Sequence, residues 1–326
     1  MKKRILALLL SVVMMLSVVC LASCDEPVDD GKYTVGVIQL VTHDALDAAT
    51  EGFVQALKDK LGEENVVIDV QNAANSIDTC ATIANAFVNK NVDLIMANAT
   101  PALQAAYNAT TTIPVLGTSV TEYGVALGIE NFSGTVGGNV SGTSDLASLE
   151  KQAQMILDLV PDAKTVGMLY CSSEANSDYQ VKKVTEYLTA KNITCMNYEF
   201  SGSDDVTTVT QKAASECDVI YIPTDNTAAS CAETIYGAMG NNRKPIIAGE
   251  SGICSGCGIA TLSISYYDLG YKTGEMAAQI LTGEADIATM PIAYAPQETK
   301  KYNAAICADL GIDTSALEAL GYIPLG

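Results

Sequence analysis

Apolar residues along this chain alternate between two spacings, which predicts strands and helices in turn. Short continuous apolar runs occupy residues 33–40, 65–70, 92–97 and 113–117, and such runs are typical of strands buried on both faces of a parallel sheet. After the first run, apolar residues recur at helical spacing from Leu46 to Leu61, and Gly62 ends the pattern. The repeated strand–helix unit predicts a right-handed parallel sheet covered by helices.

The same unit begins again in the second half of the chain. A Gly- and Ser-rich stretch at residues 122–145 interrupts the pattern, and a helix from Leu149 to Leu157 follows it and stops at Pro161. Further strands are expected at residues 165–170, 193–200, 218–223 and 244–249, with helices between them. The sequence therefore predicts an α/β protein made of two doubly wound parallel-sheet lobes.

The last seventy residues are expected to be shared between the lobes. We expect residues 259–265 and the helix at 266–281 to return to the first lobe, and residues from about 296 to join the second. The first lobe would then comprise residues 33–120 plus about 259–295, and the second residues 121–258 plus about 296–326. Several strands would cross between the lobes and act as a hinge.

The N-terminus has the pattern of an export signal. Met1-Lys2-Lys3-Arg4 precedes an apolar run from Ile5 to Val19, and the run ends in Leu21-Ala22-Ser23-Cys24. These last four residues resemble the lipobox of bacterial lipoproteins, which implies cleavage before Cys24 and lipidation of its thiol. Residues 1–23 would then be a signal peptide and residues 24–32 a tether, so the protein would be extracytoplasmic and held on the cell membrane. A single transmembrane anchor is the alternative, although the run is barely long enough.

Charge and histidine content narrow the function classes. The chain carries 18 Lys and Arg against 38 Asp and Glu, a formal net charge of -20, which argues against nucleic acid as a partner. Its one histidine is His43, so a zinc site built on several histidines is excluded, and nucleophilic triads have few ways to form. His43 is expected to open the first helix, either touching a ligand or exposed to solvent. We expect no catalytic site, no metal and no cofactor.

Two short motifs approach known catalytic patterns but fail on particular residues. The glycine-rich TVGGNVSG at 135–142 lacks the Lys-Ser or Lys-Thr ending of a phosphate loop. The GESG segment around Glu250 approximates a nucleophile elbow, but Ile253 stands where that motif needs glycine.

Cysteines give no clear disulfide or metal pattern. Of the ten, Cys20 would leave with the signal and Cys24 would carry the lipid, and eight remain scattered through a chain with ample apolar core. Cys254 and Cys257 form the one CxxC, but no second pair completes a metal site and no thioredoxin-like helix follows. We expect mostly reduced thiols.

Polar side chains gather where the predicted strands end, which is where ligands bind in open α/β sheets. These residues carry hydroxyls, amides and a few carboxylates, and they come from both lobes: Gln39, Thr42, His43, Asn98, Thr100, Thr118, Ser119 and Thr121 in the first, and Ser172, Ser173, Glu174, Asn176, Ser177, Thr224, Asp225, Asn226, Glu250 and Ser251 in the second.

Two readings of these residues remain open. Many of them begin a helix, where Ser, Thr, Asp and Asn commonly cap backbone N–H groups. The clusters SSEANS and TDN are denser than one cap requires, however. Hydroxyls beside free N–H groups suit a carboxylate, and an unpaired acid opposite, such as Asp225, suits an ammonium group. Together they predict a site for a zwitterion.

Several segments carry a family resemblance. VGVIQLVTHDALDAATEGFVQAL, ATPALQ, IPVLGTSV, NVSGTSD, VGMLYCSSEANS, IYIPTDN and YYDLGYKTGEMAAQIL are similar to the substrate-binding lipoproteins of ABC importers in the tryptophan/tyrosine-type family. The resemblance runs from about Tyr33 to the C-terminus. It implies the type I periplasmic-binding fold, in which two lobes close on one small ligand, here an aromatic or related amino acid. It also implies a permease and an ATPase as partners.

Carried onto this chain, the resemblance supports a set of ligand-binding residues from both lobes: Gln39, Thr100, Thr118, Ser119, Glu174, Asn176, Ser177, Asp225 and Asn226. The position after the strand at 244–249 adds Glu250. Relatives often read T-D-P after the fourth strand, whereas this chain has Thr121-Glu122-Tyr123, which changes the expected pocket wall. Tyr123, Tyr266 and Tyr267 are candidates to stack on an aromatic ligand, with ordinary packing as the alternative.

Other functions remain open at this point. The chain could be a sensory module that presents its closed form to a membrane receptor, or an extracytoplasmic enzyme, which one histidine and no complete nucleophile motif argue against. Among binding proteins, branched-chain amino acids, sugars or nucleosides are alternative ligands.

Overall fold

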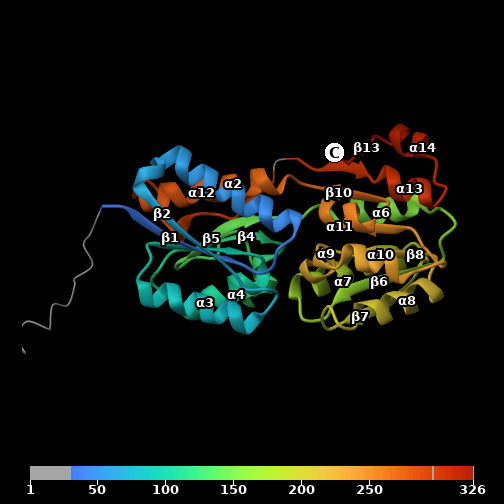
Figure 1. Cartoon of the computed structure of the whole chain (residues 1–326), viewed down its shortest axis with the longest axis horizontal. Coiled ribbons are helices and arrows are strands. Elements are labelled where there is room, and N and C mark those ends of the chain that lie inside the picture. Colours follow the sequence, from blue (N-terminus) through green and yellow to red (C-terminus); the bar gives the residue numbers. More distant parts are fainter. Residues whose placement is uncertain (1–30, 296, 326) are drawn as a thin grey trace, which may run out of the picture. The chain divides into compact units, whose positions relative to one another are not determined.

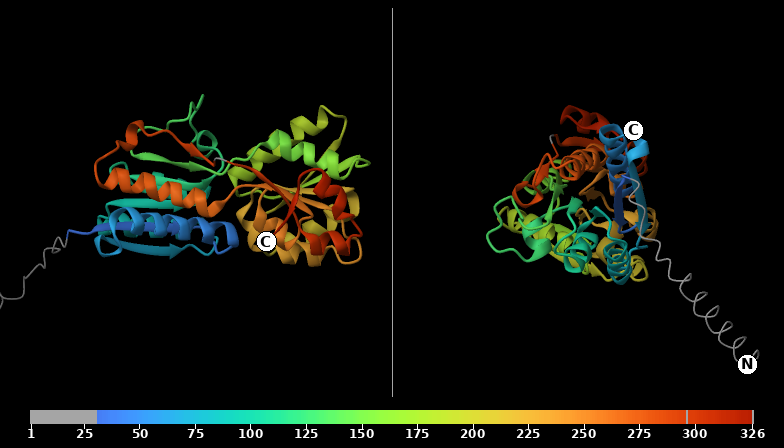
Figure 2. Two further views of the ribbon diagram at one scale, coloured as in Figure 1. Left: turned by 90° about the horizontal axis from the view of Figure 1, so that it is seen from above. Right: turned by 90° about the vertical axis from the view of Figure 1, so that its left-hand side faces the viewer.

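The computed structural model describes residues 31–295 and 297–325 of the 326-residue chain. From Tyr33 onward the chain forms one unit that contains two β-sheets, each covered by helices (Figures 1 and 2). The predicted signal peptide, Cys24 and nearly all of the predicted tether lie outside the described residues. No helix among the described residues is both long and apolar enough to cross a membrane.

The first lobe is built on a six-stranded parallel sheet with the strand order β11-β5-β4-β3-β1-β2. Its central strands are apolar and almost fully buried, which explains why they appear in the sequence as continuous apolar runs. The strands are β1 (Tyr33–Gln39), β2 (Val66–Asn72), β3 (Leu94–Asn98), β4 (Val115–Val120), β5 (Val140–Ser144) and β11 (Ala293–Tyr294).

The second lobe is built on a seven-stranded sheet with the order β13-β12-β10-β9-β8-β6-β7. Strands β6 to β10 run parallel, and β12 pairs antiparallel to β10. The strands are β6 (Thr165–Cys171), β7 (Thr194–Phe200), β8 (Val219–Ile222), β9 (Ile246–Ala248), β10 (Ala260–Ser263), β12 (Thr299–Tyr302) and β13 (Ile323–Pro324). The prediction of two α/β lobes with mainly parallel sheets is confirmed.

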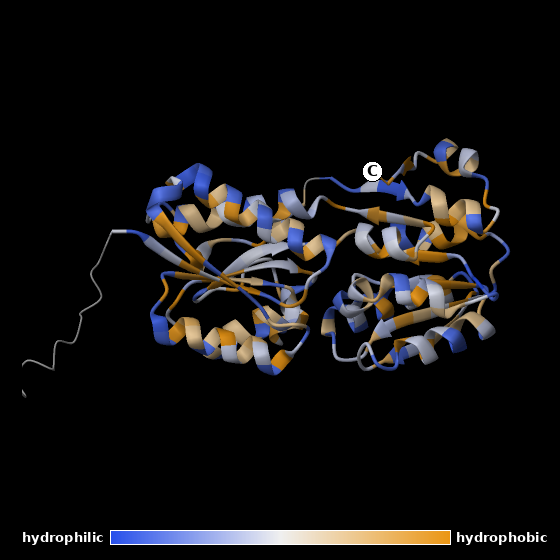
Figure 3. Cartoon of the chain, in the orientation of Figure 1, coloured by the Kyte–Doolittle hydropathy of each residue, from blue (hydrophilic) through white to orange (hydrophobic). Residues whose placement is uncertain are grey.

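Helices cover both sheets, and their apolar side chains pack with those of the strands in buried clusters. Figure 3 colours the ribbon by hydropathy and shows hydrophobic residues along the central strands. The first lobe carries α2 (Asp44–Leu61), α3 (Ile77–Lys90), α4 (Thr100–Ala109), α5 (Tyr123–Leu127), α12 (Tyr266–Leu281) and the 3-10 turns η1 (Glu63–Asn65) and η2 (Ile287–Thr289). The second carries α6 (Leu149–Leu159), α7 (Ala175–Thr189), α8 (Val206–Glu216), α9 (Asn226–Ser230), α10 (Ala232–Ala238), α11 (Ser251–Gly256), α13 (Ala304–Asp309) and α14 (Thr314–Ala319).

The chain passes between the lobes later than expected. Strand β5 belongs to the first sheet, so the first passage follows Ser144, and residues 121–144 are not part of the second lobe. Strand β10 belongs to the second sheet, so the second passage follows Ser263 rather than preceding residue 259. A third passage links β11 to β12. The first error has a physical cause, because β5 reads VSGTS and its buried hydroxyls bond to the Thr118 hydroxyl of β4 and to the carbonyls of Met290 and Thr121.

Helices α2 and α12 of the first lobe pack at unusually short range. A Cβ built at Gly270 would lie 1.9 Å from the Ala49 carbonyl oxygen, and one at Gly52 would lie 2.1 Å from that of Tyr267. Both contacts are with backbone, so neither glycine could be replaced without separating the helices. The close packing fixes the start of α12, and therefore Tyr266, relative to the first sheet.

Candidate functional site

The carboxyl ends of the two sheets meet at an interface that direct hydrogen bonds close. His43 Nε2 lies 3.3 Å from Asn226 Oδ1, and Asn75 Nδ2 donates to Thr227 Oγ1 at 3.0 Å. His43 and Asn75 belong to the first lobe, and Asn226 and Thr227 begin α9 of the second. The lobes are therefore in contact in this structure.

A cavity of about 680 Å³ opens at one side of this interface. The first lobe lines it with Leu40, the segment after β2, the start of α3 and Pro101, and the second lobe lines it with residues that follow β6, β7 and β8. The lining residues are Leu40, Ala74, Asn75, Ser76, Ile77, Asp78 and Pro101 from the first lobe, and Ser173, Glu174, Ser201, Gly202, Ser203, Asp204 and Thr227 from the second.

The three predicted site carboxylates accept hydrogen bonds from donors of their own lobe. Glu174 is 2% exposed and accepts from the backbone N–H groups of Asn226 and Thr227 and from the side chains of Asn176, Asn226 and Thr227. Glu250 caps α11 by accepting from the N–H groups of Gly252 and Ile253. Both carboxylates therefore stabilise helix N-termini.

Asp225 is not the unpaired acid that the sequence suggested. Its Oδ1 accepts from the Ala228 N–H at 2.7 Å, and its Oδ2 accepts from the Cys171 N–H and the Ser177 hydroxyl, each at 2.7 Å. Burial and the neighbouring Glu174 raise the pKa of Asp225. Ser177 is likewise committed to this contact, so both residues hold β6, α7 and α9 together inside the second lobe.

Two predicted residues of the first lobe also lie within its framework. Gln39 bonds to Asp47 and Thr50 and so joins the end of β1 to α2. The Thr118 hydroxyl lies 3.1 Å from that of Thr143, which in turn contacts Thr273 of α12 at 2.8 Å. Their side chains are engaged away from the interface between the lobes.

Other residues at the strand ends, most of them predicted, do present free polar atoms. We call a buried side-chain nitrogen or oxygen that has no hydrogen-bond partner within residues 31–295 and 297–325 an unpartnered atom. At the strand ends of the first lobe these are His43 Nδ1, Asn98 Oδ1, Thr100 Oγ1, Ser119 Oγ and Asp145 Oδ1, and on the second lobe Asn176 Oδ1 and Ser251 Oγ. Buried polar atoms in folded proteins are nearly always paired, and an unpaired one costs about 1–3 kcal/mol. A group of them at the carboxyl ends of both sheets therefore indicates a polar ligand.

Thr100 and Ser119 offer hydroxyl groups beside an open helix end. Thr100 is the first residue of α4, whose N-cap residue Ala99 supplies no side-chain cap. Ser119 is held in the left-handed region with a φ of 53°, and it is 5% exposed. Two hydroxyl donors at an uncapped helix N-terminus form a site suited to a carboxylate.

Sequence reasoning missed Asp145, which follows β5. It is 4% exposed, and its Oδ2 accepts from the Tyr266 hydroxyl at 2.9 Å while Oδ1 is unpartnered. Burial, reinforced by the nearby Glu250, raises the pKa of Asp145 to about 6. The rule of strand carboxyl ends would have selected Asp145 had the polar VSGTS segment been recognised as a strand.

The three candidate stacking tyrosines have different environments. Tyr123 is 1% exposed, donates to the Thr143 carbonyl and stacks on Phe132, so it fills the core of the first lobe. Tyr267 is 37% exposed and stacks on Tyr271 at the surface. Only Tyr266 lies at the lobe interface, in contact with Asp145. The Thr121-Glu122-Tyr123 departure therefore alters the lobe core, where Glu122 caps α5.

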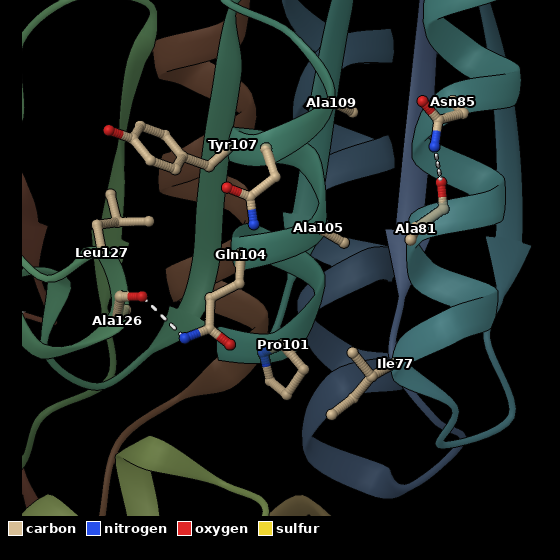
Figure 4. Close-up of a pocket in the computed structure, with 11 residues that line it drawn as sticks. Ile77, Ala81, Asn85, Pro101, Gln104, Ala105, Tyr107, Ala109, Ala126 and Leu127 are labelled. Atoms are coloured by element: carbon tan, nitrogen blue, oxygen red, sulfur yellow. Dashed lines mark hydrogen bonds between the residues drawn. The ribbon is translucent and has the colours of Figure 1, made fainter.

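The cysteines and a hollow within the first lobe add no chemistry to this site. The eight described cysteines are free, and burial raises the pKa of Cys254 and of Cys257. Within the described part of the chain, no cluster of His, Cys, Asp or Glu could hold a metal ion. A separate hollow of about 400 Å³ lies among α3, α4 and α5 (Figure 4). Its lining residues carry no charge, which makes it unsuited to a zwitterion.

Known proteins resemble this chain in sequence and in fold. The family model described as ABC transporter substrate binding protein matches residues 34–318. A tyrosine-binding protein of Clostridioides difficile strain R20291 is 40% identical over 253 residues, which cover 77% of this chain and 73% of that protein.

Two solved structures resemble this one closely. The ABC domain from Streptococcus pneumoniae in complex with L-Trp is 30% identical, with a TM-score of 0.84 over 90% of this chain and 99% of that one. The ligand-free, open structure of a substrate binding protein with adhesive properties from Clostridium difficile is 38% identical, with a TM-score of 0.67 over 90% of this chain and 100% of that one. The present structure is thus closer in shape to the ligand-bound relative, although its sequence is closer to the open one.

Proposed function

Because the chain belongs to the family of ABC transporter substrate-binding proteins, we propose that it captures an aromatic amino acid, tyrosine or tryptophan, between its two lobes. Members of this family are extracytoplasmic proteins that bind a solute and hand it to a membrane permease coupled to an ATPase. The aromatic ligand is supported by the tyrosine-binding relative and by the relative solved with L-Trp.

One observation carries the proposal: unpartnered atoms lie at the strand ends of both lobes. In the proposed complex the ligand carboxylate accepts hydrogen bonds from the hydroxyls of Thr100 and Ser119 and lies at the N-terminus of α4. Asn176 and Ser251 approach from the second lobe. Contacts from both lobes can exist together only when the lobes are closed, so the ligand shifts the population toward the closed form.

The ten residues predicted from the sequence fall into two groups under this proposal. Thr100, Ser119 and Asn176 contact the ligand. The others shape the lobes around it: Gln39 and Thr118 in the first, and Glu174, Ser177, Asp225, Asn226 and Glu250 in the second.

We further propose that the protein is held at the membrane by its N-terminus. Residues 1–23 would be removed as a signal peptide, Cys24 would carry the lipid, and residues 24–32 would serve as the tether. Without residues 1–23 the chain would keep 15 Lys and Arg against 38 Asp and Glu, a formal charge of -23 that would repel anionic lipid, so the acyl chains must provide the attachment. Mass spectrometry of the native protein tests this, since replacing Cys24 with Ala should abolish the diacylglycerol mass and release the protein from membranes.

A binding titration tests the ligand class. The chain contains no tryptophan, so the fluorescence of L-Trp reports the ligand alone. At about 100 times the Kd, a ligand that binds only the native state adds about 2.7 kcal/mol to stability and should raise Tm by several degrees. We expect L-Tyr or L-Trp to do so and to be recovered unchanged. A larger shift with leucine, a sugar or a nucleoside would overturn the aromatic assignment.

A further inference from the structure

The helical surface of the first lobe carries a hollow that the proposed function does not use. It lies among α3, α4 and α5 and has a volume of about 400 Å³, within the range of about 300–1,000 Å³ that small-molecule sites occupy (Figure 4). Ile77 and Pro101 line both this hollow and the cavity between the lobes, so the two adjoin at that edge. All three helices belong to one lobe, so the walls of the hollow do not depend on how the lobes are placed.

The lining of this hollow carries no charge. Charged residues make up 17% of the chain, but none of the eleven lining residues is charged. An anion or a cation bound here would lose water without gaining a counter-charge, which is unfavourable. The lining therefore favours an uncharged occupant.

Two side-chain amides in the hollow are held so that their oxygen atoms are the open ends. Gln104 Nε2 donates to the Ala126 carbonyl at 2.8 Å. Asn85 Nδ2 donates to the Ala81 carbonyl at 2.7 Å. Both bonds are drawn as dashed lines in Figure 4, and they leave Gln104 Oε1 and Asn85 Oδ1 as acceptors. A ligand with hydroxyl donors fits these acceptors, whereas a purely apolar ligand would bury them unpaired.

Apolar side chains form much of the remaining wall. Tyr107 is 40% exposed and Ile77 is 51% exposed, so each offers an apolar surface at the rim. Figure 4 shows Tyr107 and Leu127 on the α5 side of the hollow. A sugar ring matches such a wall, because its C–H groups pack on an aromatic ring while its hydroxyls donate to amide oxygens.

We propose that this hollow is a second binding site, and that its ligand is a neutral saccharide. Hydroxyls of the saccharide donate to the amide oxygens of Gln104 and Asn85, and one face of its ring packs on Tyr107. The site lies outside the proposed amino acid site and does not depend on it. Free sugars and the ends of glycan chains share this chemistry, and the experiment distinguishes the two sources.

The test measures Kd by titration of backbone amide chemical shifts in NMR. The probes are D-glucose and N-acetyl-D-glucosamine as free sugars and a chito-oligosaccharide as a glycan end, with indole and spermidine as an apolar and a cationic comparison. The proteins are wild type, Gln104→Leu, Tyr107→Ala and the control Gln211→Leu, which removes an exposed amide from α8 of the second lobe.

We expect wild type and Gln211→Leu to bind a saccharide equally, with a Kd on the order of 1 mM and with shifts in α3, α4 and α5. Gln104→Leu removes one neutral hydrogen bond and should weaken binding by roughly 2- to 10-fold. Tyr107→Ala removes the ring face and should weaken it by a similar factor. Saturating L-Trp should not displace the saccharide, because the two sites are separate.

The two sources give different rankings. Tighter binding of the chito-oligosaccharide than of either free sugar assigns the site to glycan ends, and the reverse order assigns it to free sugars. Both results support the site. Should Gln104→Leu fail to fold, Tyr107→Ala at the exposed rim gives the same comparison.

Three results would overturn the inference. The first is no shift with any saccharide at about ten times the expected Kd. The second is equal binding by wild type, Gln104→Leu and Tyr107→Ala, which would place the saccharide elsewhere. The third is tighter binding of indole or spermidine in this hollow than of any saccharide. None of these results bears on the amino acid titration, so the proposed function stands or fails separately.

Discussion

The Nε2 atom of His43 lies 3.3 Å from Oδ1 of Asn226, and this contact joins the two lobes. The amide orientation follows from the other side of Asn226, whose Nδ2 donates to Glu174 at 2.7 Å. Asn226 Oδ1 must therefore accept, and His43 Nε2 must carry the proton. The carboxylate that holds the start of α9 thus also orients the amide that meets the first lobe.

This contact, together with that of Asn75 with Thr227, should slow ligand release. Replacing His43 with Ala, or Asn75 with Ala, removes one neutral hydrogen bond made only in the closed form, worth about 0.5–1.5 kcal/mol. We expect each variant to release ligand roughly 2- to 10-fold faster, with a nearly unchanged association rate. Stopped-flow fluorescence with L-Trp measures both rates. A dissociation rate equal to that of wild type in both variants would show that these two hydrogen bonds do not hold the lobes closed.

His43 also offers a direct spectroscopic check. It is the one histidine in the chain, so a protein prepared without a histidine tag gives a single set of imidazole ring signals. We expect these signals to move when ligand closes the lobes, and to move little in Asn226→Ala. Signals that stay fixed on ligand addition would place His43 outside the closing interface.

Glu174 should act on stability rather than on ligand contact. A Glu174→Gln change places an NH₂ group against donors from Asn226 and Thr227, so we expect a loss of about 3 kcal/mol in the free energy of unfolding. Denaturant titration measures this. The control is Glu186→Gln on the same helix, whose pair with Lys183 is exposed and should contribute less than about 1 kcal/mol. Equal effects of the two changes would refute the structural role.

Thr100 and Ser119 should behave in the opposite way. Their hydroxyls are unpartnered, so Thr100→Val and Ser119→Ala should leave the unfolding free energy equal to or slightly above that of wild type. Each should weaken binding by roughly 10- to 100-fold, because a hydrogen bond to a charged ligand group contributes about 1.5–3 kcal/mol. Thr210→Val is the control, since its buried hydroxyl is also unpartnered but lies on α8. If the two site variants bind as tightly as this control, the carboxylate site lies elsewhere.

Binding should weaken in acid in a way that depends on Asp145. Burial, with a contribution from Glu250, raises its pKa to about 6 in the empty protein, while Tyr266 and Thr121 oppose that rise by hydrogen bonding. The ammonium group of an amino acid ligand can pair with Asp145 only when Asp145 is a carboxylate, so protons compete with the ligand below about pH 6. We expect affinity to be constant above that pH and to fall by up to about tenfold per pH unit below it.

Calorimetry across this range is the measurement, with Asp145→Asn as the comparison. The variant has no group to protonate at this position, so its weaker binding should change little between pH 7 and pH 5. If the two proteins showed the same pH dependence, another group would be responsible.

The fold was predictable where apolar patterning determines it. Continuous apolar runs such as β1 and β3 identified the parallel sheets, because strands buried on both faces need apolar side chains on both. Strand β5 carries hydroxyls instead, and its burial depends on hydrogen bonds to Thr118, Thr121 and Met290 that only the folded sheet provides. No local pattern distinguishes such a strand from a loop.

The sequence indicated the region where polar side chains gather, but not which of these side chains already have hydrogen-bond partners within their own lobe. The strand-end rule selected Thr100, Ser119 and Asn176, and the structure shows that each of them has an unpartnered atom. The strand-end rule could not distinguish an acid whose oxygens already accept hydrogen bonds from one with an unpartnered oxygen. Asp225 and Asp145 both follow strands, and they differ only in whether a helix start or a neighbouring hydroxyl fills their oxygens in three dimensions.

The tight pairing of α2 with α12 has a consequence for how the polypeptide acquires its structure. Helix α2 ends at Leu61, whereas α12 begins at Tyr266 and β11 at Ala293. In the first lobe, α2 thus cannot pack against α12, and the sheet cannot gain β11, until nearly the entire sequence has been synthesised. Contacts so distant along the chain slow folding. A polypeptide of this design stays incompletely folded throughout its synthesis, and truncation before Tyr266 would leave both lobes open to aggregation and proteolysis.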